Sequence, residues 1–186
     1  MKKFFDISLS ITLLLLLFIP ILLIGVIVLL TSSGSAIYWS ERVGKNNKIF
    51  KMPKFRSMSI NTPSVASHLL DRPDSYLSPI GGFLRRTSLD ELPQLLSVLK
   101  GDMSFVGPRP ALYNQDDLIS LRSQKGIDKL LPGITGWAQV NGRDELSIDE
   151  KVELDFEYML KQSLYFDVKI LFKTFLKVIK RNDIKH

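Results

Sequence analysis

Two acidic residues stand side by side in a short stretch near the middle of the chain. The stretch, residues 88–94, reads SLDELPQ, and its leucines indicate a partly buried setting, where an ionised carboxylate is costly unless positive charge compensates it. Ser88 and Glu91 have the S-x-x-E spacing of a helix capping box, which is the structural alternative. Pro93 argues against this alternative, because proline suits the first helical position and would lie too deep if Ser88 were the cap.

If Pro93 opens the helix instead, Asp90 and Glu91 lie just before its N-terminus. The helix dipole and the backbone donors at that end favour negative charge and hold a carboxylate ionised. An ionised carboxylate can act as a nucleophile or as a ligand for Mg²⁺. We therefore take the pair as the candidate catalytic and metal-binding group.

Arginines near this pair supply the opposite charge. Arg85 lies just upstream, and Arg109 stands between two prolines in the segment GDMSFVGPRP, residues 101–110. The prolines stiffen the backbone around the Arg109 guanidinium and lower the cost of directing it at a phosphate. A turn-rich segment follows, LLPGITGWAQVNGR, in which Gln139 can form hydrogen bonds and Arg143 adds a further possible phosphate ligand. These residue types together predict a site for a phosphorylated ligand.

Composition favours an anionic partner and excludes several other chemistries. The chain has 186 residues, enough for one domain with a sizeable core, and a formal net charge of +6 with a pI near 9.5. It has no cysteine, and it lacks the G-x-S-x-G, P-loop and G-x-G-x-x-G motifs, so thiolate, serine hydrolase and Rossmann chemistries find no support. His68 and His186 are isolated and are interpreted as plain surface residues. The basic segment before residue 57 lacks the spaced aromatics of a nucleic-acid surface, so we expect no nucleic-acid partner.

The N-terminal segment is suited to a membrane. Residues 7–30 form a run of 24 uncharged residues, longer than the ~7–15 apolar residues of a signal peptide and close to the ~20 of a membrane helix. Lys2 and Lys3 precede the run and a basic stretch follows it, so the positive-inside rule draws both ends toward the cytoplasm. Pro20 offers a kink at which the helix could turn back. We expect a re-entrant, monotopic anchor over residues 1–36, with a single crossing or a cleaved signal peptide as the alternatives.

Residues 37–186 are expected to form a cytosolic catalytic domain. Residues 48–58 alternate apolar and basic side chains like a strand, although Pro53 confines the run to a sheet edge or an irregular extension. Helices are predicted over residues 92–100, which a glycine ends, and over residues 147–161. The fold class that follows is α+β and mostly helical.

The last predicted helix, residues 167–181, has the clearest periodicity. One face is apolar and the other is basic, the apolar residues being Val168, Leu171, Phe172, Phe175, Leu176 and Ile179 and the basic ones Lys169, Lys173, Lys177, Lys180 and Arg181. A basic amphipathic helix is suited to lie on an anionic membrane. The alternative is a helix packed on its own domain with a solvated basic face, and the neighbouring anchor favours the membrane.

Four segments resemble the bacterial sugar transferases known as monotopic phosphoglycosyl transferases. They are KFRSM at 54–58, RRTSLDELPQLLSVLKGDMSFVGPRP at 85–110, PGITGWAQVNGR at 132–143 and DVKI at 167–170. The resemblance extends over essentially the whole chain, and its long central motif is highly specific. The chain resembles the minimal catalytic form of the family, without a preceding multi-spanning domain.

In that family a sugar 1-phosphate moves from a UDP-sugar to undecaprenyl phosphate at the cytoplasmic face of the bacterial inner membrane, as the first membrane step of surface-glycan assembly. The resemblance implies that Asp90 is the nucleophile of a covalent phosphosugar intermediate, and that Asp90 and Glu91 hold Mg²⁺. It also implies contacts with substrate or phosphate by Lys54, Arg85, Arg109, Gln139, Arg143 and Asp155. Membrane lipids are further expected partners, and the resemblance leaves a homodimer open.

The chain departs from the family pattern around the anchor. Ile19 stands where members often have a serine before the anchor proline, and Ser40-Glu41-Arg42 stands where Q-x-R is common. Two other functions stay open, a catalytically silent membrane scaffold and a metal-dependent phosphohydrolase that uses water in place of the lipid. Residues 59–79 form a proline-rich loop that we expect to influence the choice of sugar, which the sequence does not name.

Overall fold

Helices dominate the structure, a computed structural model that describes residues 1–63, 65, 72–142 and 145–180. In chain order the elements are α1 (Lys2–Leu16), α2 (Phe18–Thr31), β1 (Ile37–Val43), η1 (Lys45–Asn47), β2 (Ile49–Phe55), η3 (Pro73–Tyr76), α3 (Gly81–Thr87), η4 (Leu89–Gln94), α4 (Leu95–Lys100), β3 (Ser104–Val106), α5 (Asp116–Gln124), η5 (Ile127–Lys129), β4 (Gly133–Thr135), α6 (Trp137–Asn141), α7 (Ile148–Lys161) and α8 (Leu164–Lys180), where η marks 3₁₀ helix. The predicted fold class, α+β and mostly helical, is confirmed.

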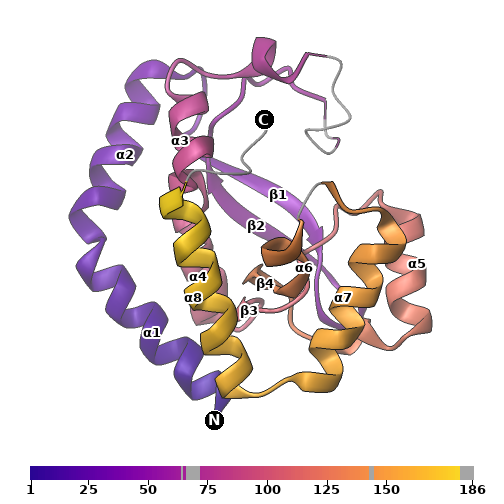
Figure 1. Cartoon of the computed structure of the whole chain (residues 1–186). Helices are drawn as coiled ribbons and strands as arrows, with labels where there is room; N and C mark the ends of the chain where they lie inside the picture. The colour runs from indigo at the N-terminus through magenta and orange to yellow at the C-terminus, as the bar shows by residue number, and fades with distance from the viewer. Residues whose placement is uncertain (64, 66–71, 143–144, 181–186) are drawn as a thin grey trace.

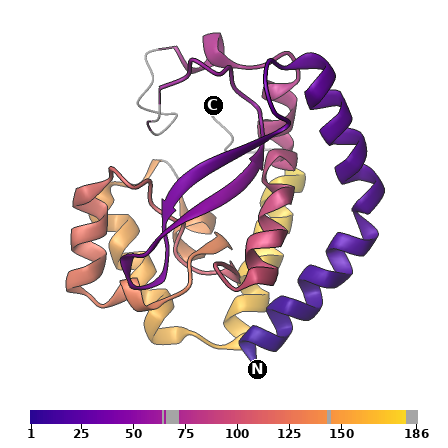
Figure 2. The same cartoon turned by 180° about the vertical axis from the view of Figure 1, so that it is seen from behind.

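The elements are arranged as a bowed arm beside a compact group. The arm consists of α1 and α2 and lies along one side of the molecule, while α5 and α7 lie at the other side (Figure 1). Seen from behind, the β1–β2 hairpin crosses the middle of the molecule (Figure 2). The sheets of the described chain are small. β1 pairs with β2, antiparallel, and β3 with β4, parallel, and an isolated bridge joins Arg42 of β1 to Leu112.

The arm bends between its two helices. α1 and α2 meet at Leu17 with an angle of 65° between them. Pro20 has no N–H to offer the Leu16 carbonyl, and its ring crowds that carbonyl, so the break falls one turn before the proline. In the described part of the chain no single helix has the length and apolar composition to cross a bilayer, whereas the two helices together have both as a bent pair.

Polar contacts fasten the first half of the arm to the rest of the chain. The Ser104 hydroxyl donates to Asp6 Oδ2 at 2.8 Å, and the Phe105 N–H donates to Asp6 Oδ1 at 3.3 Å. One turn further on, the Ser10 hydroxyl donates to the Leu95 carbonyl at 2.8 Å. Asp6 and Ser10 are buried although α1 is mainly apolar, so this face of α1 lies against β3 and α4 rather than against lipid.

β1 and β2 form an antiparallel hairpin that delivers Lys54 to the middle of the molecule. Ile37 pairs with Phe55, and Trp39 pairs with Pro53. The missing N–H of Pro53 is tolerated because this sheet has only two strands, so the prediction that the proline confines this run to an edge is confirmed. Lys54 is the last residue but one of β2, and the end of β2 packs against η4.

The largest core cluster surrounds the parallel pair of β3 and β4. Ser104 faces Gly133 in this pair, and a side chain at Gly133 would bring its Cβ within 2.1 Å of the Gly107 nitrogen. The buried apolar residues of the cluster are Met52, Leu95, Val98, Met103, Phe105, Val106, Val140, Tyr158, Phe166 and Ile170. Close packing of this kind holds the segment that follows β3, residues 107–111, in one place.

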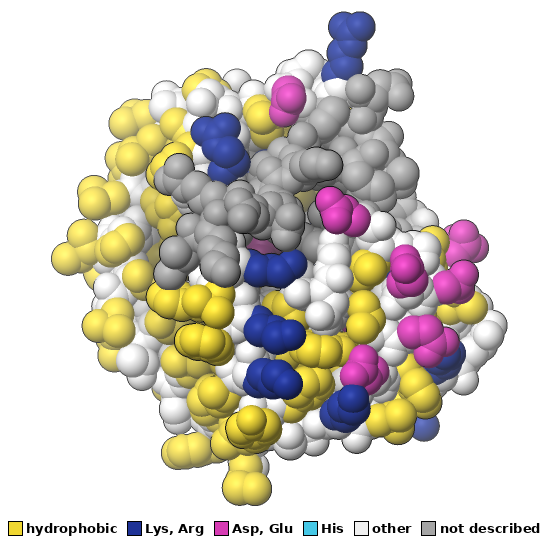
Figure 3. Space-filling view, in the orientation of Figure 1, with side chains coloured by type: hydrophobic (Ala, Val, Ile, Leu, Met, Phe, Trp, Pro, Cys, Tyr) yellow, Lys and Arg dark blue, Asp and Glu magenta, His cyan; other side chains and the backbone are white. Residues whose placement is uncertain are grey.

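α8 confirms the amphipathic helix predicted over residues 167–181, of which Arg181 lies outside the described residues. Its buried side is formed by Phe166, Asp167 and Ile170. Its large apolar side chains at the surface are Leu164, Tyr165, Val168, Phe172, Phe175, Leu176 and Val178. Apolar side chains also gather over the arm, and a column of basic side chains runs down the front of the molecule near α8 (Figure 3). The helix thus packs on its own domain through one side, as the alternative expected, and leaves an apolar face at the surface. Such a face is typical of a membrane contact, which stays a prediction.

The helix predicted over residues 147–161 is confirmed as α7, and a capping box begins it. Ser147 Oγ accepts a hydrogen bond from the Glu150 N–H at 3.2 Å, and Glu150 Oε2 accepts one from the Ser147 N–H at 2.8 Å. Two N–H groups that the first turn of a helix leaves without partners are thereby satisfied.

We expect Ser147→Ala to lower the free energy of unfolding by about 1 kcal/mol, because the Glu150 N–H loses its acceptor. Denaturant unfolding in detergent micelles measures the change. Ser147→Asp keeps an acceptor at the same place and serves as the control, with an expected change of less than about 0.5 kcal/mol. Equal losses in the two variants would contradict the capping role.

Candidate active site

Three separate segments of the chain meet at Glu91. Lys54, from the end of β2, donates to Glu91 Oε1 at 2.8 Å, and Arg109, from the loop after β3, reaches the same oxygen at 3.5 Å. The exposed fraction of the side chain is 14% for Glu91, 15% for Lys54 and 35% for Arg109. Partial burial strengthens the attraction between these charges. The structure therefore brings together three of the residues that the sequence predicted for the site.

The acidic pair lies in a 3₁₀ turn between α3 and α4. Ser88 ends α3 in the left-handed conformation, with φ 57°, and turns the chain into η4. Asp90 and Glu91 occupy the first turn of η4. The capping-box alternative is wrong, because the Ser88 side chain makes no capping hydrogen bond.

The position of Pro93 differs from the one expected. The proline lies inside η4, and the α-helix begins two residues later at Leu95. The physical reason is that the ring of Pro93 crowds the Leu89 carbonyl, which an α-helix one turn earlier would have to use. Gly101, with φ 86°, ends α4 as predicted.

Asp90 is the more deeply buried member of the pair, with 8% of the residue exposed. Burial raises its pKa to about 6, while the charge of Lys54 opposes this rise and the Glu91 carboxylate adds to it. Burial also lowers the pKa of Lys54, an effect that Glu91 and Asp90 oppose. A carboxyl with this pKa is ionised at neutral pH yet poorly solvated, which suits a nucleophile.

Arg42 belongs to this group of charges although sequence reasoning missed it. Its pKa is lowered to about 10, first by burial and then by the charge of Arg109. Its Nη1 donates to the Pro110 carbonyl at 3.2 Å and its Nε to the Ser40 hydroxyl at 3.0 Å. The only signal in the sequence was its place in the Ser40-Glu41-Arg42 triplet after the anchor, where the family commonly has Q-x-R.

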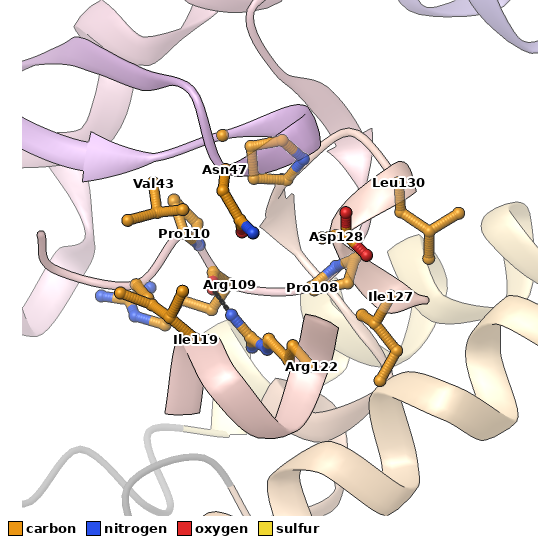
Figure 4. A pocket seen from close by; sticks show the side chains of 13 residues that line it. Val43, Asn47, Pro108, Arg109, Pro110, Ile119, Arg122, Ile127, Asp128 and Leu130 are labelled. Atoms are coloured by element: carbon orange, nitrogen blue, oxygen red, sulfur yellow. Dashed lines mark hydrogen bonds between the residues drawn. The ribbon is translucent and has the colours of Figure 1, made fainter. Parts of the chain in front are cut away.

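A pocket beside the Pro108–Pro110 segment is too small for a nucleotide. It is lined by Val43, Asn47, Ile119, Arg122, Asp128 and Leu130 together with that segment (Figure 4). Its volume of about 30 Å³ is of the order of one water molecule. Figure 4 shows the Arg109 side chain extending away from Arg122. The pocket therefore lies among the residues that support the Arg109 loop.

Asp155 is placed apart from the other predicted residues. It is buried, with 1% exposed, and its Oδ2 accepts hydrogen bonds from Arg122 Nε at 3.0 Å and from Arg122 Nη2 at 2.5 Å. Burial raises the pKa of Asp155, and the Arg122 charge opposes that rise. Arg122 in turn donates through Nη1 to the Arg109 carbonyl at 2.8 Å. Asp155 thus reaches the site through Arg122, a second residue that sequence reasoning missed, and its direct contact with a substrate stays a prediction.

The remaining predicted ligands are placed less completely. Arg85, on α3, has its Nη1 2.9 Å from Met58 Sδ, and its charge lowers the pKa of Asp90 against the effect of burial. Gln139, on α6, has buried amide atoms without a hydrogen-bond partner among the described residues. Arg143 lies outside the described residues. Contacts of these three with substrate stay predictions.

Asp90 and Glu91 are the residues that would hold Mg²⁺. Within the described ranges, no group of three or more His, Cys, Asp or Glu side chains could hold a metal ion. Mg²⁺ is commonly held by one or two carboxylates together with waters and the phosphates of a substrate. Two adjacent carboxylates therefore fit an Mg²⁺ ion that arrives with a nucleotide, and the metal stays a prediction.

Comparison with known proteins identifies the class. The family model described as bacterial sugar transferase matches residues 1–181, and the chain belongs to this family. The family resemblance read from the sequence is thereby confirmed.

Several individual relatives share this similarity. The UDP-glucose:undecaprenyl-phosphate glucose-1-phosphate transferase of Escherichia coli is 42% identical, over 95% of this chain and 40% of that protein. The undecaprenyl-phosphate galactose phosphotransferase of Salmonella typhimurium is 38% identical, over 98% of this chain and 41% of that protein. The uncharacterized sugar transferase EpsL of Bacillus subtilis is 39% identical, over 100% of this chain and 90% of that protein. The chain thus spans less than half of the two enterobacterial relatives and most of the Bacillus one.

We expect the Asp90 carboxyl to titrate near pH 6 in the metal-free protein, above its ordinary value of 3.8, because burial favours the protonated form. Carbon-13 NMR of aspartate-labelled protein measures this, with the resonance assigned by its loss in Asp90→Asn. Glu91→Gln removes a negative neighbour and should lower the pKa of Asp90.

Glu153→Gln is the control for this titration, because Glu153 is 65% exposed and its charge is screened by solvent. It should leave the pKa of Asp90 unchanged. An Asp90 resonance that titrates near its ordinary value, or one that moves to higher pH in Glu91→Gln, would contradict the geometry described here.

Proposed function

We propose that the chain is a phosphoglycosyl transferase that moves a sugar 1-phosphate from a UDP-sugar to undecaprenyl phosphate and so begins surface-glycan assembly. The observation that carries the proposal is the pair of buried Asp90 and partly buried Glu91, next to which Lys54 and Arg109 converge from separate segments. The names of the Escherichia coli and Salmonella typhimurium relatives support the acceptor and the type of reaction.

In the first half-reaction a carboxylate oxygen of Asp90 attacks the phosphorus that bears the sugar. The bond from this phosphorus to the bridging oxygen breaks, and UMP leaves with the electron pair, so that an aspartyl phosphosugar remains. Lys54 and Arg109 are placed to offset the negative charge of the transferring phosphoryl group. Mg²⁺ held by Asp90 and Glu91 together with phosphate oxygens would add to this charge compensation.

In the second half-reaction a phosphate oxygen of undecaprenyl phosphate attacks the same phosphorus. The bond to Asp90 breaks, the carboxylate is restored, and the lipid diphosphate sugar is the product. Because UMP leaves before the lipid reacts, the two anionic substrates need not occupy the site together, and ping-pong kinetics follow.

Two other functions remain to be separated by experiment. A silent membrane scaffold has no use for a buried carboxylate pair, because burial of charge without a ligand costs stability. A phosphohydrolase would use water as the acceptor and would release free sugar phosphate without a lipid product.

We expect an adduct of one sugar phosphate on the wild-type chain after incubation with Mg²⁺ and the matching UDP-sugar, without lipid. Intact-mass spectrometry over a panel of UDP-sugars measures the adduct and names the sugar. Asp90→Asn should form none, because the amide is not a nucleophile. Asp102→Asn, at an exposed position outside the site, is the matched control and should form the adduct normally.

Addition of undecaprenyl phosphate should discharge the adduct and give a lipid-linked sugar. Loss of the adduct to free sugar phosphate in the presence of the lipid would favour the phosphohydrolase. A wild-type chain that neither forms an adduct nor releases UMP with any sugar of the panel would exclude the transferase and favour the scaffold.

We further propose that α1 and α2 form a re-entrant anchor on the cytoplasmic face of the inner membrane. The 65° bend, the basic residues on both flanks and the exposed apolar face of α8 support this placement. The phosphate of the lipid lies at the level of the headgroups, whereas the nucleotide sugar is dissolved in the cytosol. A site held at this boundary is accessible to both.

We expect cysteines introduced as Lys3→Cys and Ser35→Cys to react with a membrane-impermeant maleimide from the cytoplasmic side only. The natural chain has no cysteine, so each variant carries a single label site. Labelling of inverted vesicles and of intact spheroplasts measures the side, and Asp102→Cys provides the cytosolic reference. A helix that crosses the membrane once would place the two labels on opposite sides. Labelling of one variant from the periplasmic side would therefore contradict the re-entrant anchor.

A further inference from the structure

We infer that Arg122 is a positioning residue for the donor site: it holds the backbone of Arg109, and Asp155 fixes Arg122 in turn. This inference rests on the proposed function, in which Arg109 binds a phosphate of the UDP-sugar. It assigns Asp155 an indirect role, through Arg122, and adds Arg122 to the residues on which donor binding depends.

The loop that carries Arg109 is held by its carbonyl oxygens. Four consecutive carbonyls each accept a hydrogen bond from outside the loop: Pro108 from the Gly133 N–H at 2.9 Å, Arg109 from Arg122 at 2.8 Å, Pro110 from Arg42 at 3.2 Å and Ala111 from the Val43 N–H at 2.9 Å. Two of these donors are backbone groups of strands and would survive most substitutions. Arg122 is the donor that binds residue 109 itself, so it sets the origin of the Arg109 side chain.

Arg122 is itself held in one orientation. Its Nε and Nη2 both donate to Asp155 Oδ2, and its Nη1 is directed at the Arg109 carbonyl. Only 11% of the Arg122 side chain is exposed. The planar guanidinium cannot turn without losing the contacts to Asp155, so Asp155 fixes the direction of the remaining donor. In Figure 4 the Arg122 guanidinium lies against the Arg109 backbone, while the Arg109 side chain extends to the other side.

Stability alone is a poor explanation for this buried pair. Removing two charges from water is costly, and well-packed apolar residues often replace such a pair without loss of stability. Asp155 Oδ1 has no hydrogen-bond partner among the described residues, which adds a further cost. The pair is better explained by the hydrogen bond from Arg122 to the Arg109 carbonyl, which fixes the Arg109 backbone.

The competing explanation is that Arg122 and Asp155 merely join α5 to α7. The chain offers a matched comparison, because Lys125 at the end of α5 forms an ion pair with Glu153 of α7. This second pair links the same two helices, and among the described residues no hydrogen bond or ion pair joins it to the loop of Arg109. A variant that lacks this ion pair therefore measures the effect of weakening the contact between α5 and α7 alone.

The test is a double-mutant cycle between Arg122 and Arg109, with UDP and Mg²⁺ as the probe. Calorimetry measures the Kd for UDP in the detergent-solubilised full chain, because UDP carries the phosphates that all UDP-sugars share. We expect Arg122→Met to raise this Kd about tenfold, a modest effect for a displaced binding group. In a chain that already carries Arg109→Gln, the same change should have almost no further effect, since residues that act through one another are not additive.

Turnover gives a second readout. Arg122→Met should raise the KM for the UDP-sugar and leave the KM for undecaprenyl phosphate unchanged, because the lipid reacts after the nucleotide has left. Lys125→Met should leave both values and the UDP affinity as in the wild type. Arg122→Met with Asp155→Leu removes both buried charges, so it should disturb the fold less than the single variant, which leaves Asp155 buried and unpaired. This paired variant should show the same loss of UDP affinity.

Additive effects of Arg122→Met and Arg109→Gln would overturn the inference, as would wild-type UDP affinity in a folded Arg122→Met and Asp155→Leu chain. The adduct assay on the wild type distinguishes failure of this inference from failure of the proposed function. If the wild type binds UDP but forms no phosphosugar adduct, the proposed transferase function is disproved. The double-mutant cycle with UDP still tests the positioning role of Arg122. If the wild type does not bind UDP, Arg109 is not a phosphate ligand for the donor. The inference about Arg122 is then disproved as well.

Discussion

A buried aspartate and a partly buried glutamate, Asp90 and Glu91, stand side by side, and much of the structure is arranged around their charge. Lys54 comes from β2, Arg109 from the loop after β3, and Asp90 and Glu91 from the turn between α3 and α4. Each cation belongs to a different element from the acids that it compensates. The hairpin, the β3–β4 pair and η4 must therefore all be in place before the site exists, because each carboxylate alone would be costly to bury.

The environment gives the two acids different characters. Glu91 is held by Lys54 and Arg109, so its charge is compensated directly. Asp90 lies deeper, and burial raises its pKa to about 6. Neighbouring carboxylates whose surroundings differ in this way can take different roles in one reaction. Asp90 is buried and weakly solvated, which suits a nucleophile. Glu91 is paired with cations, which suits a residue that stays ionised during the reaction.

The first helix, α1, is joined to the same central region. Lys2, at the start of α1, donates to Asp167 at 2.6 Å and to the Val106 carbonyl at 3.1 Å, and the Tyr158 hydroxyl donates to that carbonyl at 3.0 Å. Val106 directly precedes the loop that carries Arg109. The strand that supports the arginine loop is thus also the one to which α1 is fixed, so the position of α1 and that of the site are set together.

Local features of the chain could be predicted from sequence, and long-range ones could not. The acidic pair, the arginine between two prolines, the bend before Pro20 and the helix that begins at Ser147 depend on neighbouring residues, whose backbone preferences are written in order along the chain. The indirect place of Asp155 and the contacts of Arg42 and Arg122 with the arginine loop depend on packing between distant segments. Arg42 and Pro110 are 68 positions apart, and no periodicity or spacing relates them. The sequence by itself determined which groups are present for phosphate chemistry, whereas only the tertiary structure decided which of them meet, because burial and charge compensation arise when separate elements pack together.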